Sequence, residues 1–512
     1  MMKRSIAEIP LRRRVGGWCV TTLVLFMALL FTRLLFFTPS QQPDAARCVA
    51  VAHETTVSEP NLARVLSKAI QFRTISYDDG MRDGADQFLG LHRLLRTEFP
   101  KVHQHLQHET VANFSLLYRW EGSDPSLRPY LLASHLDVVP TPTETLSAWD
   151  VDPFSGELRD GFVYGRGTID DKCGVIALLA ACEDLLTQGF HPQRTIYLAF
   201  GHDEEIGGKG ALAIVNLLQK RDIRLEFVLD EGLPIMTEGM PGISVPVALI
   251  GVSEKGAVSI ELEVETPPGH SSMPPSEGAI GILAKAVRAL EENPFPSSLE
   301  GVAGHLFEVL APEMSFPWNL LFANRDLLSP LILWGMERQP TQAAFVRTTT
   351  ALTVFQSGEK NNVIPSRATA VVNHRLVPGD SIAQVLERDR RIINDPRVHI
   401  RLLEGWEPSK VTCHHASGYK LIEYTNLQVN SERFEEGMLI APGLMIGATD
   451  SRIYEPITDQ MYRHNPIRMN KADTKRFHGI NERIAVEDLS ALVRFFFHLI
   501  HNADFMLPQE SE

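Results

Sequence analysis

The chain has 512 residues, of which 44% are hydrophobic and 22% are charged, and this composition excludes a disordered, collagen-like or coiled-coil protein. The formal net charge is −14, and no stretch offers the basic face that a nucleic-acid-binding protein needs. Five cysteines are too few for a disulfide scaffold of this size, and no Cys-x-x-Cys pair indicates a cysteine zinc site. Whether Cys48, Cys173, Cys182 and Cys413 pair with one another is left open.

Residues 1–40 are typical of a targeting segment. Basic residues precede the apolar run Val15–Thr32, which is near the lower limit of about 18 residues for a spanning helix. The basic residues predict that this end stays in the cytoplasm and that the remainder enters the lumen. A cleaved signal peptide and a retained signal anchor both fit, and the poor cleavage pattern favours the anchor slightly. We therefore expect a secreted or lumenal body, in which Asn113 begins a glycosylation sequon, with membrane contact only through an uncleaved N-terminal segment.

From about residue 59 the chain alternates short apolar runs with helical stretches. Three of these runs, Tyr130–Ser134, Thr195–Phe200 and Leu225–Leu229, are typical of buried strands. Between the first two, Gly174–Leu186 is predicted to be a helix. Such alternation predicts an α/β fold with a mostly parallel central sheet that is covered on both faces.

The pattern changes near residue 253, where strands of a different style begin. The run Ala257–Glu265 alternates apolar and polar residues, which is typical of a half-exposed antiparallel strand, and Thr350–Phe355 and Ala368–Leu376 continue that style. We interpret this part as an α+β lid or dimerisation domain that interrupts the α/β catalytic domain. The predicted boundaries are 59–252 for the first catalytic part, 253–408 for the lid and 409–512 for the second catalytic part.

The predicted catalytic strands run directly into side chains that can bind metals. The first ends at His135 and Asp137, the second at Asp203-Glu204-Glu205, and the third at Asp230-Glu231, while Asp170-Asp171 precedes the helix. In open α/β sheets ligands bind beyond the carboxyl ends of the strands, so these groups should meet at one edge. Carboxylates crowded there would repel one another, and cations would remove that cost. Imidazole and carboxylates without a thiolate suit zinc, with manganese or cobalt as alternatives.

Each of these motifs alone also has a plain structural explanation. A His-x-Asp is usually an ordinary strand end, a run of three acids a solvated turn, and an Asp-Asp pair a helix cap. Their succession at the strand ends of one sheet favours a metal site. No Gly-x-Ser-x-Gly, P-loop, His-Glu-x-x-His or Rossmann fingerprint offers a competing chemistry.

Four of these motifs together resemble a known family. The segments SHLDVVP, GRGTIDDK, GHDEEIGG and FVLDEG, in this order within about residues 60–500, are similar to the co-catalytic zinc metallopeptidases that include aminoacylase, carnosinase, carboxypeptidase S and the glutamate carboxypeptidases. Further segments, SEKGAVSIELEV, GHSSMPP, RTTTALTVF, NVIP and FHGINE, resemble the branch of secreted animal enzymes that synthesise and hydrolyse N-fatty-acyl amino acids.

The resemblance implies two zinc ions per chain that share the carboxylate of Asp170. It assigns His135 and Asp230 to one ion, and Glu205 and His478 to the other. His464 is the rival for the last position, but it lacks the flanking pattern Arg-Phe-His-Gly-Ile-Asn-Glu.

The resemblance also implies the roles of the groups around the ions. Glu204 would be the general base and acid, and Asp137 would fix the tautomer and orientation of His135. The peptide bond between Asp170 and Asp171 would be cis, a strained form that persists only where the surroundings hold it.

The lid would supply substrate recognition. By the resemblance, His270 reaches across a homodimer to the partner's active site and polarises the scissile carbonyl, while Asn362 and Arg375 contact the substrate. A guanidinium at Arg375 suits a substrate carboxylate, because its fork binds carboxylates bidentately, although a surface strand charge is the alternative. The segment Phe295–Phe345 is rich in aromatic residues, and packing is favoured over an apolar wall for an acyl chain.

The expected activity is zinc-dependent hydrolysis, and reverse condensation, of the amide bond of N-fatty-acyl amino acids. The alternative is a carboxypeptidase or aminoacylase that acts on peptides or short N-acyl amino acids. A catalytically inactive binding protein on the same scaffold would require a lost ligand or base, and none is lost.

Overall fold

The computed structural model describes residues 11–37, 54–77, 84–430, 433–434 and 436–507. Parts of the predicted targeting segment and Cys48 lie outside these ranges. Within them, no helix is long and apolar enough to cross a membrane. Cys173 and Cys182 are buried free thiols, and Cys413 is an exposed one.

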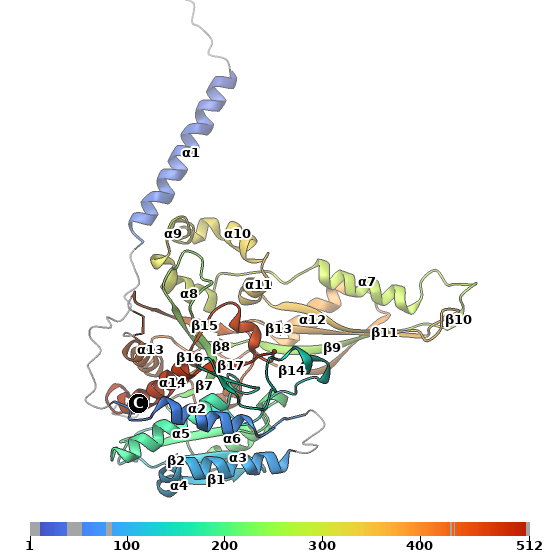
Figure 1. The fold of residues 1–512 in the computed structure, drawn as a ribbon. Coiled ribbons are helices and arrows are strands. Elements are labelled where there is room, and N and C mark those ends of the chain that lie inside the picture. The colour runs from blue at the N-terminus through green and yellow to red at the C-terminus, as the bar shows by residue number, and fades with distance from the viewer. Residues whose placement is uncertain (1–10, 38–53, 78–83, 431–432, 435, 508–512) are drawn as a thin grey trace, which may run out of the picture.

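An eight-stranded, mainly parallel sheet forms the centre of the catalytic domain (Figure 1). In order across the sheet the strands are β1 (Gln107–Val111), β2 (Ser115–Trp120), β6 (Ile196–Gly201), β3 (Tyr130–His135), β7 (Val228–Met236), β16 (Met461–Met469), β8 (Val247–Glu254) and β15 (Leu439–Met445). The pairs β6–β3, β3–β7, β7–β16 and β8–β15 are parallel, and β1 and β2 form an antiparallel edge. The predicted α/β class with a mostly parallel sheet is confirmed.

Helices cover both faces of this sheet. On one face lie α2 (Glu59–Ile70), α3 (Ala85–Glu98), α4 (Pro100–His105), α5 (Lys172–Thr187), α13 (Ser417–Asn430) and α14 (Val486–Met506), and on the other lies α6 (Lys209–Lys220). Along β3, Leu132 packs into the hydrophobic core beneath α5 and α14, and its neighbour Leu131 packs into the core beneath α6. A strand buried on both faces reads as a continuous apolar run, which is why β3 and β6 were recognisable in the sequence.

The lid domain has its own antiparallel sheet and core. Its strands, in order across the sheet, are β11 (Thr349–Ser357), β13 (Arg367–Leu376), β9 (Gly256–Glu265) and β14 (Val398–Trp406). Helices α7 (Ala279–Glu292) and α12 (Ile382–Ile393) pack on one face, and along β13 buried residues alternate with more exposed ones. The short pair β10 (Gly269–His270) and β12 (Val363–Ile364) lies at the far tip of the lid (Figure 1).

Four short helices between α7 and β11 form an insert that leaves the lid and packs on the catalytic sheet. They are α8 (Val302–Leu310), α9 (Trp318–Ala323), α10 (Arg325–Met336) and α11 (Pro340–Val346), and their core includes Leu439 and Ala441 of β15. The N-terminal helix α1 (Leu11–Leu35) emerges from the body beside α9 and α10 (Figure 1). The aromatic segment predicted to pack does so in part: Phe295 and Phe322 are buried, whereas Phe316, Trp318 and Trp334 are exposed.

Candidate metal centre

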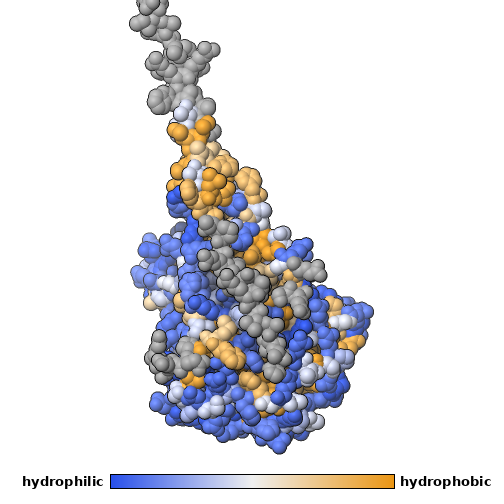
Figure 2. Space-filling view, turned by 90° about the vertical axis from the view of Figure 1, so that its left-hand side faces the viewer, coloured by the Kyte–Doolittle hydropathy of each residue, from blue (hydrophilic) through white to orange (hydrophobic). Residues whose placement is uncertain are grey.

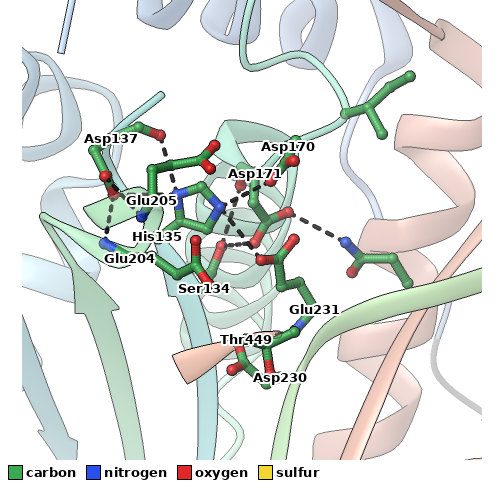
Figure 3. Close-up of polar contacts among 12 residues, drawn as sticks. Ser134, His135, Asp137, Asp170, Asp171, Glu204, Glu205, Asp230, Glu231 and Thr449 are labelled. Carbon is green, nitrogen blue, oxygen red and sulfur yellow. Dashed lines mark hydrogen bonds and ion pairs between the residues drawn. The ribbon is translucent and has the colours of Figure 1, made fainter. Parts of the chain in front are cut away.

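The carboxyl ends of β3 and β6 meet the predicted metal-site acids at one edge of the sheet (Figure 3). The neighbouring strand β7 does not end at Asp230, as the sequence predicted, but continues through Asp230 and Glu231 to Met236. His135 is the last residue of β3, and its side chain is only 1% exposed. Its Nε2 lies 2.9 Å from Asp170 Oδ1 and 3.3 Å from Glu231 Oε1. These three residues form one group that could hold a metal ion.

A second group shares the same aspartate. His478 Nε2 lies 3.0 Å from Asp170 Oδ2 and 3.1 Å from Glu205 Oε2, and the three form another possible metal-binding group. The two oxygens of Asp170 therefore point to two different histidines, which is the arrangement that a carboxylate bridging two cations requires.

Asp137 supports this arrangement from behind. The Nδ1–H of His135 donates to the backbone oxygen of Asp137 at 3.0 Å, which leaves Nε2 free to act as a ligand. The Asp137 carboxylate accepts hydrogen bonds from Ser76 Oγ at 2.6 Å and from the backbone N–H groups of Glu204 and Glu205, each at 3.2 Å. One buried acid thus positions both the imidazole and the short helix η3 (Glu204–Ile206).

The turn that presents Asp170 is held by a residue that the sequence analysis did not single out, Glu482. Its buried carboxylate pairs with Arg166 Nη1 at 2.5 Å and accepts the backbone N–H groups of Gly167 and Ile169 at 3.0 and 2.8 Å. Strand β5 (Phe162–Tyr164) pairs with β17 (Arg483–Ala485), and this pairing brings the turn beside the segment that carries His478. The peptide bond between Asp170 and Asp171 is cis.

Two neighbouring acids on β7 are candidates for one predicted ligand position. Asp230, which the resemblance assigned, is buried; its Oδ1 accepts the N–H of Glu231 at 2.9 Å, and its Oδ2 has no hydrogen-bond partner among the described residues. Glu231, which the sequence placed at the same strand end but to which the resemblance gave no role, is the acid that lies against His135. The only sequence signal was its place directly after Asp230.

The charges at this edge do not balance. Burial raises the pKa of Glu204 and of Glu231 well above the ordinary value, and it raises the pKa of Asp230 to about 6. Burial also acts to raise the pKa of Asp170, but hydrogen bonds with His135 and His478 outweigh it and lower that pKa. Hydrogen bonds to Asp170 and Glu205 raise the pKa of His478 to about 10.

This imbalance fits a site for cations. Five carboxylates surround two imidazoles, and the buried oxygens Glu205 Oε1 and Asp230 Oδ2 lack hydrogen-bond partners among the residues described. Divalent cations would neutralise the mutual repulsion and would occupy these oxygens. Nitrogen and oxygen donors without sulfur are compatible with zinc.

The loop that contains Thr449 and Asp450 lies beside the site, next to the junction of β8 and β9 at residues 254–256, which we call the hinge. Glu254, at the end of β8, accepts the N–H and the hydroxyl of Thr449 at 3.2 and 3.0 Å and pairs with buried Arg463 at 3.2 Å. The next residue, Asp450, packs so tightly on Gly208 that a methyl group there would overlap Asp450 Oδ1, and Gly208 has a φ of +70°. This contact explains the glycine that follows the acidic turn.

The predicted lid residues do not reach the metal centre within one chain. His270 and Asn362 are exposed and lie at the lid tip, where Gly269 and His270 pair with β12. Arg375 lies in β13, and its guanidinium stacks over Trp406 at 5.9 Å and has no hydrogen-bonded partner among the residues that the structure describes. His464, the rival ligand, is buried between the backbone oxygens of β7 and β8, away from the two groups above.

Comparison with known proteins is consistent across sequence and structure. The model of Peptidase family M20/M25/M40 matches residues 131–502. A probable carboxypeptidase S-like 2 of Dictyostelium discoideum is 45% identical over 458 residues (88% of this chain, 86% of the relative), and the N-fatty-acyl-amino acid synthase/hydrolase PM20D1 of Homo sapiens is 41% identical over 492 residues (95% and 96%). The M20 family metallo-carboxypeptidase Sso-CP2 from Sulfolobus solfataricus superposes with a TM-score of 0.61 at 18% identity, over 86% of this chain and 98% of the other, which shows a shared fold.

Proposed function

The chain belongs to peptidase family M20/M25/M40, and from this premise we propose that it hydrolyses, and in reverse forms, the amide bond of N-fatty-acyl amino acids. It is a metal-dependent amidohydrolase. The observation that carries the proposal is the Asp170 carboxylate held between His135 and His478, with Glu204 beside them. The acyl-amino-acid substrate is supported by the synthase/hydrolase relatives.

We propose two zinc ions as the cofactors of this centre. Asp170 would contact both ions, His135 and an acid of β7 would complete the first set, and Glu205 with His478 would complete the second. Zinc supplies Lewis acidity when bound, because it polarises carbonyl groups and makes hydroxide available at neutral pH. The resemblance names Asp230 as the acid of β7, and the contact with His135 favours Glu231.

Glu204 is proposed as the proton carrier. Its carboxylate lies in one group with the His135 imidazole and the Glu205 carboxylate, and the ligand atoms of the three residues are all within 4.8 Å of one another. Glu205 is occupied by His478, so Glu204 is the acid that remains to take a proton from the attacking water and to pass it to the departing amine. Its raised pKa, caused by burial, favours the protonated form that the second step needs.

Recognition of the substrate carboxylate is assigned to Arg375. Burial lowers the pKa of its guanidinium, which nevertheless stays charged at neutral pH, and no carboxylate of the described chain is hydrogen-bonded to it. His270 and Asn362 would contribute from a partner subunit through the lid. This assignment requires a homodimer, because both residues lie at the lid tip of their own chain.

A carboxypeptidase that acts on peptides is the second candidate. The similarity to carboxypeptidase S-like proteins favours it, since one of them is 45% identical to this chain. Both candidates cleave an amide beside a free carboxyl group, so they differ in the acyl side of the substrate. The compartment is proposed to be the secretory pathway, and Asn113 is exposed in the turn after β1, as a glycosylated residue must be.

The test compares zinc content and amidase activity of the purified chain with those of Glu204→Gln. We expect zinc content to be retained and hydrolysis of oleoyl-phenylalanine to fall by about 10²–10⁴-fold, the usual contribution of a general base. Glu121→Gln is the matched control, because Glu121 is exposed and follows Trp120, which pairs with the amino end of β6, opposite to the end that carries the site. Unchanged activity would remove Glu204 as the base, and faster turnover of a dipeptide than of oleoyl-phenylalanine would favour the carboxypeptidase.

A further inference from the structure

Helix α1 exposes apolar side chains around its whole circumference over residues 24–27, before the turn that attaches it to the body. Val24, Leu25, Phe26 and Met27 are consecutive, and their exposed fractions are 59, 65, 40 and 39%. Successive helical residues point about 100° apart, so these four side chains surround the helix. A protein partner with one contact face would leave several of them in water, whereas lipid covers all sides at once.

The same helix is fixed to the body at its base. Leu30 is 5% exposed, and its backbone oxygen accepts a hydrogen bond of 3.1 Å from Asn324 Nδ2. Arg33 forms a bidentate pair with Asp326 of α10, at 2.7 and 2.8 Å. Because α1 is attached to α9 and α10 in this way, a lipid environment around α1 would also surround these two helices.

A second apolar surface lies beside this attachment. We call it the α9–α10 patch, and it consists of Phe316, Trp318, Leu327, Leu331 and Trp334, all exposed. Figure 2 shows hydrophobic residues both along α1 and at the end of the body from which α1 emerges. The guanidinium carbon of Arg338 lies 3.5 Å from the centroid of the Trp334 ring, so the patch contains an aromatic ring in contact with a cation. Such amphipathic pairs are favoured where one side is apolar and the other is wet.

The cations at this end do not make an electrostatic site. Arg33 is paired with Asp326, and Arg325 is paired with Glu308 at 2.7 Å. Arg338, on the Trp334 ring, is then the one cation of the patch that has no ion pair among the described residues. Apolar contact therefore contributes more to the attraction of an occupant than anionic charge does, which favours the interface of a bilayer over an acidic protein.

We propose that the α9–α10 patch rests on the surface of a phospholipid bilayer, with the C-terminal half of α1 embedded beside it. The lipid contact then involves the folded body and is not confined to the N-terminal segment. The insert that carries the patch ends in α11, and Lys255, between β8 and β9, donates hydrogen bonds to the backbone oxygens of Ala344 in this helix and of Arg347 directly after it, at 2.8 and 2.9 Å. The lipid-facing helices are thus tied directly to the junction of the two domains. The proposal is independent of which amide the enzyme cleaves.

Tryptophan fluorescence on brominated lipid tests the contact. The chain has six tryptophans, and Trp18→Phe removes the one that lies in α1. The full-length Trp18→Phe chain is reconstituted in phosphatidylcholine vesicles with ordinary or brominated acyl chains. We expect brominated lipid to quench part of the emission, and the additional changes Trp318→Phe and Trp334→Phe to abolish the quenching. Trp120→Phe, which alters a buried ring of β2, is the matched control and should leave the quenching unchanged.

Three outcomes would overturn the proposal. Equal emission of Trp18→Phe in both vesicle types would show that the body does not touch lipid. Quenching that persists in the triple variant would place the contact elsewhere on the body. A change in emission that follows chain concentration instead of lipid would make the patch a contact between copies. Raising the salt concentration should weaken the expected quenching only slightly, because Arg33 and Arg325 are already paired and Arg338 is the one cation of the patch with no ion pair in the described part of the chain.

Discussion

Replacing Glu482 with glutamine would test whether one buried acid holds the turn that presents Asp170, the proposed shared ligand. The carboxylate of Glu482 pairs with Arg166 and accepts two strong backbone hydrogen bonds, from Gly167 and Ile169. Glutamine keeps the shape of the side chain and one acceptor oxygen, but it removes the charge. Arg166, only 2% exposed, is then left without a counter-ion.

The expected cost follows from that unpaired charge. Removing one partner of a buried ion pair typically costs about 3–5 kcal/mol. Burial raises the pKa of Glu482 even though Arg166 and the N–H of Ile169 oppose it, so the pair offsets only part of the cost of burying this carboxylate. We therefore expect a loss of about 3 kcal/mol, at the lower end of that range.

Urea unfolding and zinc content measured on the same preparations form the assay. The exposed pair of Glu121 with Arg119, at 3.2 Å, offers the control, because Glu121→Gln should cost less than about 1 kcal/mol. The double variant Arg166→Met with Glu482→Met removes both charges and should recover part of the lost stability. A cost below about 1 kcal/mol for Glu482→Gln, with zinc content unchanged, would refute the reasoning.

Three further changes test separate parts of the structure. Asp230→Asn and Glu231→Gln should differ in zinc per chain, measured by elemental analysis, and the variant that loses about one ion identifies the ligand; equal retention in both would exclude the two acids. Gly208→Ala should destabilise the fold by at least about 1–2 kcal/mol in urea, from its positive φ alone, and more through overlap with Asp450; an unchanged midpoint would contradict this packing. Burial lowers the pKa of Lys255 to about 7, so between pH 7 and about 10.4 the unfolded state binds more protons and stability rises with pH; Lys255→Met should flatten that rise.

The parts of the fold that could be predicted from the sequence are those with a local cause. Strands β3 and β6 are buried on both faces and appear in the sequence as continuous apolar runs. In β9 and β13 buried and more exposed positions alternate, and the sequence shows this as alternating apolar and polar residues. The acids and His135 followed from the same logic, because parallel strands place their carboxyl ends at one edge, whereas His478 was named only through the family resemblance. The structure brings His135, Asp170, Glu205 and His478 together. The roles assigned to these residues remain predictions that the zinc measurements test.

Contacts between distant segments left no such signal. Arg166 and Glu482 are 316 positions apart, and neither residue alone differs from an ordinary surface charge in the sequence. The pairing of β5 with β17, which joins them, involves only three residues on each strand. Strands this short carry too little periodicity to be recognised.

Asp230 and Glu231 are both near the proposed metal centre because of a small backbone irregularity in β7. In a regular strand neighbouring side chains point to opposite faces, so only one of two adjacent acids should reach a given site. β7 is irregular here, because Gly232 has a φ of +145° and the pairing with β16 shifts in register between Arg463 and His464. The irregularity follows from close packing, since a side chain at Gly232 would collide with Arg463, and that arginine is in turn fixed by Glu254 at the hinge. Both acids are therefore kept at the centre by a contact that joins three separate strands, and no window of sequence contains that contact.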